Sequence, residues 1–313
     1  MTITRATVIA GALLTIGVVG CRRTEPAPPP DDTASAARRT AATPDPSTSH
    51  IYLCPMDKDI RSYGPGKCPR CGMALVTDIP EPAEYHLDLS VDPPPAPNQK
   101  TRLTFAVSDP WKGNPVTKFG LVHEKLFHAF IVSRDLEFFV HDHPVWNGSV
   151  FQYDVVLPKP GMYRVLGDFY PEAATPQLLT QTVFVAGDEP PPARLVRDYS
   201  GKQASNLRVE MTTNPPNPVA GEPTQLRFSL TPGTGIERLL GAWAHMLAAS
   251  DDLIDMMHEH PSLADGGPEM QFSLVFPRAR LYRVWVQFQR DGFVNTAHFD
   301  IPVAVEHPNP GAS

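Results

Sequence analysis

The chain has 313 residues, of which 42% are hydrophobic, and a formal net charge of −7. This length can hold two or three domains with hydrophobic cores of their own. The acidic balance argues against a nucleic-acid partner, because such proteins carry a basic surface.

The N-terminal 49 residues predict a signal, an anchor and a tether. Residues 1–20 combine Arg5 with an apolar run too short to span a bilayer, which is typical of a signal peptide. The run ends Val-Val-Gly-Cys21 and resembles the bacterial lipobox, which implies lipidation of Cys21 and a lipid-anchored place in the bacterial envelope, facing the periplasm or the exterior. A buried cysteine after a plain secretory signal is the alternative. Residues 21–49 are rich in Pro and Ala and predict a disordered tether.

Residues 50–79 form a cysteine-rich segment that predicts a metal site. The cysteines are spaced C-x13-C-x2-C, with Gly-Pro-Gly before the second. Thiolates and thioethers select soft or borderline ions such as copper(I), silver(I) and zinc. Three cysteines cannot all pair in disulfides within the segment. The candidate ligands are Cys54, Cys68, Cys71, Met56 and Met73.

This segment resembles the heavy-metal-binding domain of copper and silver efflux adaptors and copper-transporting P-type ATPases. The matching pattern is Tyr-x-Cys-Pro-Met from Tyr52, then Pro-Gly-x-Cys-Pro-x-Cys-Gly-Met-x-Leu from Pro65. Asp57 stands where the family usually has histidine, so a fourth ligand would be Asp57, a methionine or His50, or is lost. The resemblance implies copper or silver. A structural zinc knuckle or an ordinary disulfide is the alternative.

Beyond Pro80 the sequence predicts a mainly β fold with two tandem immunoglobulin-like β-sandwiches. Short β-branched and aromatic runs alternate with Pro- and Gly-rich breaks. An offset of 117 maps His128 onto His245, and an offset of 119 maps Tyr163 onto Tyr282, which indicates an internal repeat. We expect the sandwiches at residues 85–187 and 206–306, each with about seven strands and a tyrosine corner at Pro-Gly-x-Tyr. The linker, 188–205, predicts a flexible connection between separate domains.

Each repeat carries a histidine followed, 13 residues later, by His-x-His-Pro. A tight turn between Arg134 and Asp135 would set His128 directly opposite His141, with His143 on the same face. Two separate metal sites are therefore predicted, with ligands His128, His141 and His143 in the first, and His245, His258 and His260 in the second. Structural hydrogen bonding and a catalytic role are the alternatives.

The two repeats differ beside these triplets. Met256 shares the face of His258 and would add a soft ligand, where the first repeat has Phe139. The repeats also resemble the YtkA-like group of secreted immunoglobulin-like domains, through His123-Glu-Lys and the histidines that follow it. That resemblance implies an export-associated, copper-related domain without a settled activity.

Together these features predict an envelope lipoprotein that binds copper or silver, or zinc. It would act as a metal chaperone, a buffer or an accessory factor in metal resistance or efflux, with an efflux system or a metalloprotein acceptor as partner. A protein-binding scaffold with a structural zinc module is one alternative. A metalloenzyme with a three-histidine site is another, although the sequence shows no catalytic motif and we expect no enzyme.

Overall fold

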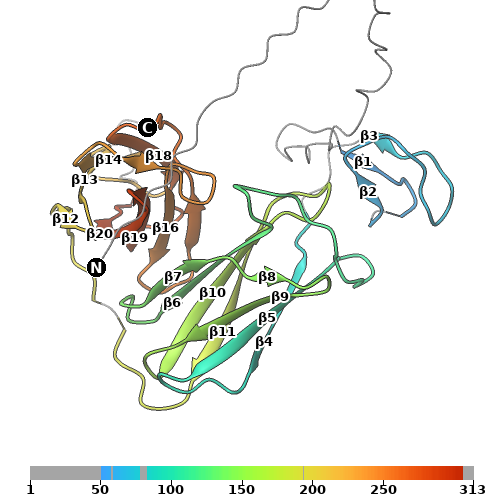
Figure 1. Cartoon of the computed structure of the whole chain (residues 1–313), viewed down its shortest axis with the longest axis horizontal. Helices are drawn as coiled ribbons and strands as arrows, with labels where there is room; N and C mark the ends of the chain where they lie inside the picture. The colour runs from blue at the N-terminus through green and yellow to red at the C-terminus, as the bar shows by residue number, and fades with distance from the viewer. Residues whose placement is uncertain (1–50, 58, 78–82, 193, 306–313) are drawn as a thin grey trace, which may run out of the picture. The chain divides into compact units, whose positions relative to one another are not determined.

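The computed structural model describes residues 51–305, except 58, 78–82 and 193. The predicted signal peptide, tether, lipidated Cys21 and His50 lie outside these residues. All regular elements in the described part are strands (Figure 1), and no helix there is long and apolar enough to cross a membrane. The described residues all belong to one compact unit. The predicted mainly β fold is confirmed.

The cysteine-rich segment folds into a small three-stranded sheet. Its strands β1 (Tyr52–Leu53), β2 (Arg61–Ser62) and β3 (Val76–Thr77) pair in the order β2-β1-β3. A turn brings the amide of Gly72 within 2.9 Å of the Cys68 carbonyl oxygen, and Gly72 adopts the left-handed conformation that glycine tolerates. Strands of two residues cannot bury a core, and the ion pairs of Arg70 with Asp57 and Asp59 add contacts within the module.

The first sandwich consists of two four-stranded antiparallel sheets. The sheet orders are β4-β5-β9-β8 and β11-β10-β6-β7. Its core lies between them and is built from alternate residues such as Leu103, Phe105 and Ile131. The strands are β4 (His86–Asp92), β5 (Lys100–Ser108), β6 (Phe127–Ser133), β7 (Phe139–Asp142), β8 (Val145–Trp146), β9 (Phe151–Val156), β10 (Gly161–Phe169) and β11 (Gln177–Val185).

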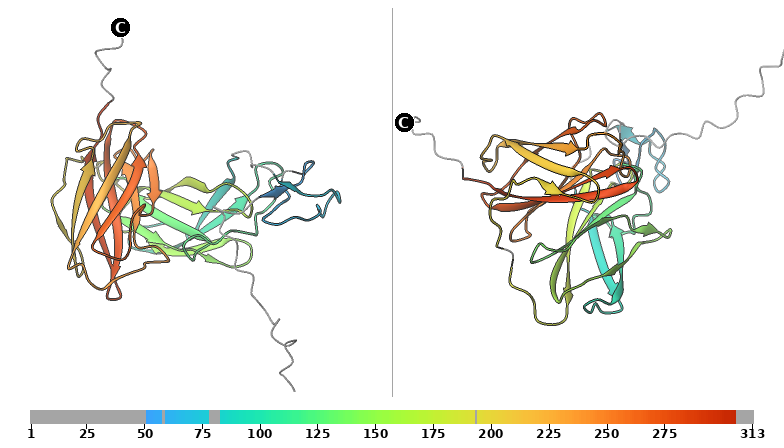
Figure 2. Two further views of the ribbon diagram at one scale, coloured as in Figure 1. Left: turned by 90° about the horizontal axis from the view of Figure 1, so that it is seen from above. Right: turned by 60° about the vertical axis from the view of Figure 1, so that its left-hand side comes forward.

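The second sandwich repeats this plan, and Figure 2 shows both from two further directions. Its sheets have the orders β12-β13-β14-β18 and β15-β19-β16-β17, with β20 pairing with β19. The offset of the repeat carries β6 onto β16, β7 onto β17 and β10 onto β19. The strands are β12 (Lys202–Gln203), β13 (Arg208–Asn214), β14 (Pro223–Thr231), β15 (Ile236–Glu237), β16 (His245–Ser250), β17 (Met256–Glu259), β18 (Glu269–Val275), β19 (Leu281–Arg290) and β20 (Phe293–Pro302).

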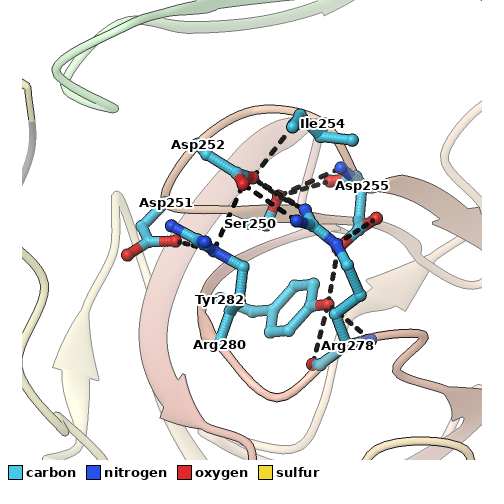
Figure 3. Close-up of polar contacts among 8 residues, drawn as sticks. All are labelled: Ser250, Asp251, Asp252, Ile254, Asp255, Arg278, Arg280 and Tyr282. Atoms are coloured by element: carbon cyan, nitrogen blue, oxygen red, sulfur yellow. Dashed lines mark hydrogen bonds and ion pairs between the residues drawn. The ribbon is translucent and has the colours of Figure 1, made fainter.

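Both repeats have the expected tyrosine corner. The hydroxyl of Tyr163 donates to the Lys159 carbonyl oxygen at 2.9 Å, and that of Tyr282 lies 3.1 Å from the Arg278 carbonyl oxygen. In the second repeat the Arg278 guanidinium also pairs with Asp252 and Asp255, which ties the corner to the hairpin loop between β16 and β17 (Figure 3). The corner therefore anchors the loop that precedes the His-x-His segment.

The two sandwiches share a buried apolar cluster, which differs from the expected flexible connection. Strands β6 and β16 are buried along their whole length, because one face lies on the core of its own sandwich and the other faces the opposite repeat. Phe139 stacks on Trp285 across this contact with ring centroids 5.0 Å apart. Leu195, within the predicted linker, is buried in the same cluster. The cluster consists of Phe130, Val132, Leu136, Leu166, Leu195, Leu247, Ala249, Leu253, Met256 and Trp285.

The hairpin register differs by two residues from the expected one. Phe130, not His128, lies opposite His141, because the loop after Ser133 contains four residues instead of a tight turn. Leu136 takes a φ of 58°, and the Asp135 carboxylate accepts the Glu137 amide hydrogen at 3.2 Å, which stabilises the longer loop. Leu253 and Asp252 repeat this arrangement in the second sandwich. An even shift leaves each side chain on its original face, so the three histidines of each repeat still share one face.

Candidate metal centres

The three cysteines of the small module converge as the spacing predicts. The Sγ atoms of Cys54 and Cys71 lie 3.5 Å apart, and one ligand atom each from Cys54, Cys68, Cys71 and Asp57 lies within 4.8 Å of the others. Sulfurs that share one tetrahedral zinc at about 2.3 Å lie roughly 3.8 Å apart. Cys54 and Cys68 are buried and all three thiols are free of disulfides. The donor set and its spacing therefore fit one ion.

Asp57 occupies the position left open by the missing histidine. Its Oδ2 lies 3.6 Å from the Cys68 sulfur, whereas its Oδ1 accepts hydrogen bonds from Arg70 and Lys112, each at 2.7 Å. Lys112 belongs to the first sandwich, so the bond also ties the module to it. One carboxylate oxygen is thus held by cations while the other faces the sulfurs, which is how outer partners orient a metal ligand.

The charges around the cysteines favour a bound cation. The hydrogen bonds from Lys112 and Arg70 lower the pKa of Asp57 to about 2, so this carboxylate is ionised at neutral pH. Burial opposes ionisation of Cys54, but hydrogen bonds from the amides of Asp57 and Met56 lower the pKa of its thiol overall. The Met73 amide lowers the pKa of Cys71, whereas burial and the neighbouring Cys54 raise it, with a net value of about 11. A bound cation would displace the remaining thiol protons, and its positive charge would offset the repulsion between the resulting thiolates.

The two methionines of the module lie at its surface. Met56 is 73% exposed and Met73 is 43% exposed. Their side chains are therefore open to solvent, whereas Cys54 and Cys68 are buried.

The histidines of the first sandwich form the expected triplet. His128 Nδ1 lies 3.0 Å from His143 Nε2 and 3.4 Å from His141 Nε2. His128 is 2% exposed, and its Nε2 lies 3.2 Å from the carbonyl oxygen of Val122. Strands β6 and β7 supply the first two residues, and His143 follows β7 directly.

The second triplet repeats these contacts but does not stand apart from the first. His260 Nε2 lies 3.0 Å from His245 Nδ1, and His245 Nε2 lies 2.8 Å from the Leu239 carbonyl oxygen. His141 of the first repeat joins His245 and His258 of the second, with one ligand atom from each within 4.8 Å of the others. The structure thus brings the two predicted sites together on the faces where the sandwiches meet. We call these six residues the histidine cluster: His128, His141, His143, His245, His258 and His260.

Two further residues orient the cluster and were missed by the sequence analysis. Asp168 Oδ2 lies 2.6 Å from His258 Nδ1, and Gln287 Oε1 lies 2.9 Å from His141 Nδ1. Each bond crosses between the sandwiches, and the repeat offset of 119 carries Asp168 onto Gln287. Both residues face the first histidine of their own repeat across a strand pair, with His128 opposite Asp168 and His245 opposite Gln287. Because Asp168 and Gln287 occupy equivalent positions in the two repeats, the repeat alignment could have pointed to them as partners of the histidines.

Burial keeps the cluster neutral. It lowers the pKa of His143 and of His245 to about 3, and it lowers the pKa values of His141 and His258 well below the usual range. The same burial raises the pKa of Asp168 to about 6. At neutral pH the Asp168 carboxylate is therefore mostly ionised and accepts the Nδ1 hydrogen of a neutral His258.

Met256 and His123 lie near the histidine cluster, one in the shared apolar cluster and one against a histidine of the other repeat. Met256 is buried in the shared apolar cluster, two positions from His258. His123, which the sequence analysis noted only through the YtkA-like resemblance, stacks on His260 of the other repeat with ring centroids 3.8 Å apart.

Family comparisons agree with the two parts of the chain. A model described as "Heavy metal binding domain" matches residues 51–77. A model described as "Domain of unknown function (DUF8832)" matches residues 80–186 and again 202–305, which together make up roughly two-thirds of the chain. The chain belongs to this family. Its two sandwiches are DUF8832 repeats. Comparison with curated protein sequences gives no match.

Solved structures match the chain only at low sequence identity and low TM-score. Two fibronectin type III domains of chicken tenascin match 70% of this chain and 100% of their own, at 12% identity and a TM-score of 0.22. Domains FN1 to FN3 of chicken CNTN1 match 77% of this chain and 76% of theirs, at 11% identity and a TM-score of 0.19. Invasin, a bacterial integrin-binding protein, matches 71% of this chain at 12% identity and a TM-score of 0.22, and the chain spans 40% of its length.

Proposed function

We propose that the chain is a lipid-anchored protein of the bacterial envelope that captures copper or silver and hands it to an efflux system or a metalloprotein acceptor. The observation that carries the proposal is the convergence of Cys54, Cys68 and Cys71 within one cluster in the part of the chain that matches the heavy-metal-binding domain. Three thiolates supply the soft ligand set that copper(I) and silver(I) prefer.

The partly exposed position of this cluster supports transfer of the ion. Cys71 lies at the surface whereas Cys54 and Cys68 are buried, and Met56 and Met73 stand exposed nearby in the sequence. An acceptor thiolate could replace Cys71 first and the buried ligands afterwards. The lipid at Cys21 and the tether that follows would keep the site at the membrane surface, where an efflux partner works.

The test is metal binding by the mature full chain. Copper(I) bound per chain is measured by competition with a chromophoric chelator, for the natural sequence and for the Cys54→Ser, Cys68→Ser and Cys71→Ser substitutions combined. The proposal expects loss of the tightest copper(I) site in the substituted chain, and unchanged stoichiometry and affinity would overturn it. Labelling with radioactive palmitate, with Cys21→Ser as control, tests the anchor separately.

A second function, a scaffold lipoprotein with structural zinc, is favoured by the small size of the module. Its strands have two residues each, and its side-chain contacts include the converging cysteines and the pairs of Asp57 and Asp59 with Arg70. Zinc would then fold the module, as it folds other domains that lack a core. Zinc that stays bound while copper(I) with excess thiol is added would favour this function over copper capture.

A further inference from the structure

The histidine cluster has a symmetry that two independent sites would not need. His141 of the first DUF8832 repeat bonds to Gln287 of the second, and His258 of the second bonds to Asp168 of the first. Equivalent residues of the two repeats make these two bonds, so each sandwich orients one histidine of the other. The side chains are also enclosed, since His258 is only 1% exposed in its side chain.

The hydrogen bonds fix which nitrogen of each ring carries the hydrogen and which carries the lone pair. Carbonyl oxygens accept but cannot donate, so His128 and His245 carry their hydrogens on Nε2, toward Val122 and Leu239. Their Nδ1 atoms are then acceptors within the cluster, and each lies 3.0 Å from an Nε2 atom, that of His143 or of His260. For His258 the carboxylate of Asp168 holds the hydrogen on Nδ1, which leaves the Nε2 lone pair free.

The same reasoning applies to His141. The side-chain amide nitrogen of Gln287 donates to Thr296 Oγ1 at 3.0 Å, so its oxygen is the atom that faces His141 Nδ1. His141 Nδ1 therefore donates, and its Nε2 lone pair points toward His128 Nδ1 at 3.4 Å. These two nitrogens are both acceptors and cannot form a hydrogen bond with each other.

One nitrogen at the centre of the cluster has no partner. His258 Nε2 is buried and makes no hydrogen bond within the described part of the chain. Buried polar atoms are normally paired, and an unpaired one needs an explanation. One nitrogen each from His141, His245 and His258 lies within 4.8 Å of the others, and each of these rings is held by an outer acceptor, as is usual for imidazoles around a bound metal ion.

We propose that the histidine cluster is a single metal centre shared by the two DUF8832 repeats, which binds Zn²⁺ or Cu²⁺ through His141, His245 and His258. Neutral imidazoles suit these borderline divalent ions, and no thiolate lies in the cluster. His128 and His143 adjoin this set through His141, which belongs to both groups of converging nitrogens. The centre requires both repeats and therefore fastens them together. It does not rest on the proposed copper function of the cysteine module.

The test uses the full mature chain with Cys54, Cys68 and Cys71 replaced by serine, so that the cysteine module contributes no ligand. Zn²⁺ and Cu²⁺ are titrated in separate experiments by calorimetry with a competing chelator. The substitution His258→Gln, or His141→Gln in the other repeat, is expected to lower the affinity for the first ion at least 100-fold. His86→Gln, an exposed histidine of β4 outside the cluster, is the matched control and should bind as the parent does.

Two results would overturn the proposal. If His258→Gln keeps the first ion at full affinity on the remaining repeat, the triplets are independent sites. If the parent chain cannot take either ion from the competing chelator, the cluster is held by hydrogen bonds alone. X-ray absorption of the zinc-loaded parent needs no substitution in the cluster: at least three imidazole ligands and no sulfur are expected, and a shell of oxygen ligands alone would count against the centre.

Discussion

At the scale of single residues, we expect Asp57 to influence whether the cysteine module prefers zinc or copper(I). Its Oδ2 faces the Cys68 sulfur in the place of the family's histidine. A carboxylate oxygen is a good fourth ligand for zinc but a poor one for a soft monovalent ion, for which three thiolates suffice. Replacing this residue, which departs from the family pattern, should therefore change the affinities for zinc and copper(I) by different amounts.

We expect Asp57→Ala to weaken Zn²⁺ binding by roughly tenfold or more while copper(I) affinity changes little, because only zinc loses a ligand. Chelator competition with each ion measures the two affinities. Asp59→Ala is the matched control, since Asp59 pairs with the same Arg70 and Lys112 but lies outside the group of converging ligands. Equal weakening by both substitutions would show that charge, and not ligation, is responsible.

A second residue-scale prediction concerns Asp168. Replacement by Asn keeps the shape but removes the carboxylate that orients His258, and loss of such an outer partner costs about 10–100-fold in metal affinity. Calorimetric titration with Zn²⁺ measures this loss in the chain that carries serine at positions 54, 68 and 71. Asp88→Asn, an exposed position on β4, should have no effect. Unchanged affinity in the Asp168 variant would mean that the carboxylate does not support a bound ion.

At the scale of the element, the loop between β16 and β17 depends on a pairing of charges. Burial alone would raise the pKa of Asp252, but the Arg278 guanidinium and the Ser250 hydroxyl hold it well below the usual range (Figure 3). A carboxyl group with a depressed pKa adds stability above its unfolded value of about 4, and this stability is lost as the pH falls through and below that value.

We therefore predict that Asp252→Asn lowers the free energy of unfolding at pH 7, and that its difference from the natural chain shrinks as the pH falls from about 5 toward 2. Urea unfolding at a series of pH values, followed by tryptophan fluorescence, measures this difference. Asp88→Asn controls for the loss of one negative charge at the surface. A difference that stays constant with pH would show that ionisation of Asp252 does not contribute.

At the scale of the whole molecule, the shared apolar cluster holds the two DUF8832 repeats together. Burial of apolar side chains on the facing sheets is reinforced by Arg283, which donates to the Leu136 carbonyl oxygen and pairs with Glu137 of the other repeat. Since the histidine cluster draws on both repeats, separation of the sandwiches should destroy it without any change to a histidine.

Leu166→Glu tests this relation. Leu166 is 1% exposed in the shared cluster, and an unpaired buried carboxylate is costly enough to part the two faces. We expect a larger radius of gyration by small-angle X-ray scattering, retained β-type circular dichroism and loss of tight Zn²⁺ binding by the histidines. Leu178→Glu, on a side chain that is 42% exposed, is the control. Tight binding that survives separation would contradict a shared centre.

The sequence by itself determined the β class, the repeat and the converging cysteines. Cys54, Cys68 and Cys71 come together because their spacing and the Gly72 turn are local. The histidines of each repeat share a face because strand periodicity is two, which even the shifted register preserved.

Only the tertiary structure decided that the two histidine triplets form one cluster. The uninterrupted apolar runs of β6 and β16 were compatible with strands buried on both faces, but periodicity does not say what covers the second face. The partners Asp168 and Gln287 lie about 90 and 146 residues from the histidines they orient, so no local pattern could join them. Packing of one sheet on another fixes such contacts, because it depends on the shape of two complete surfaces.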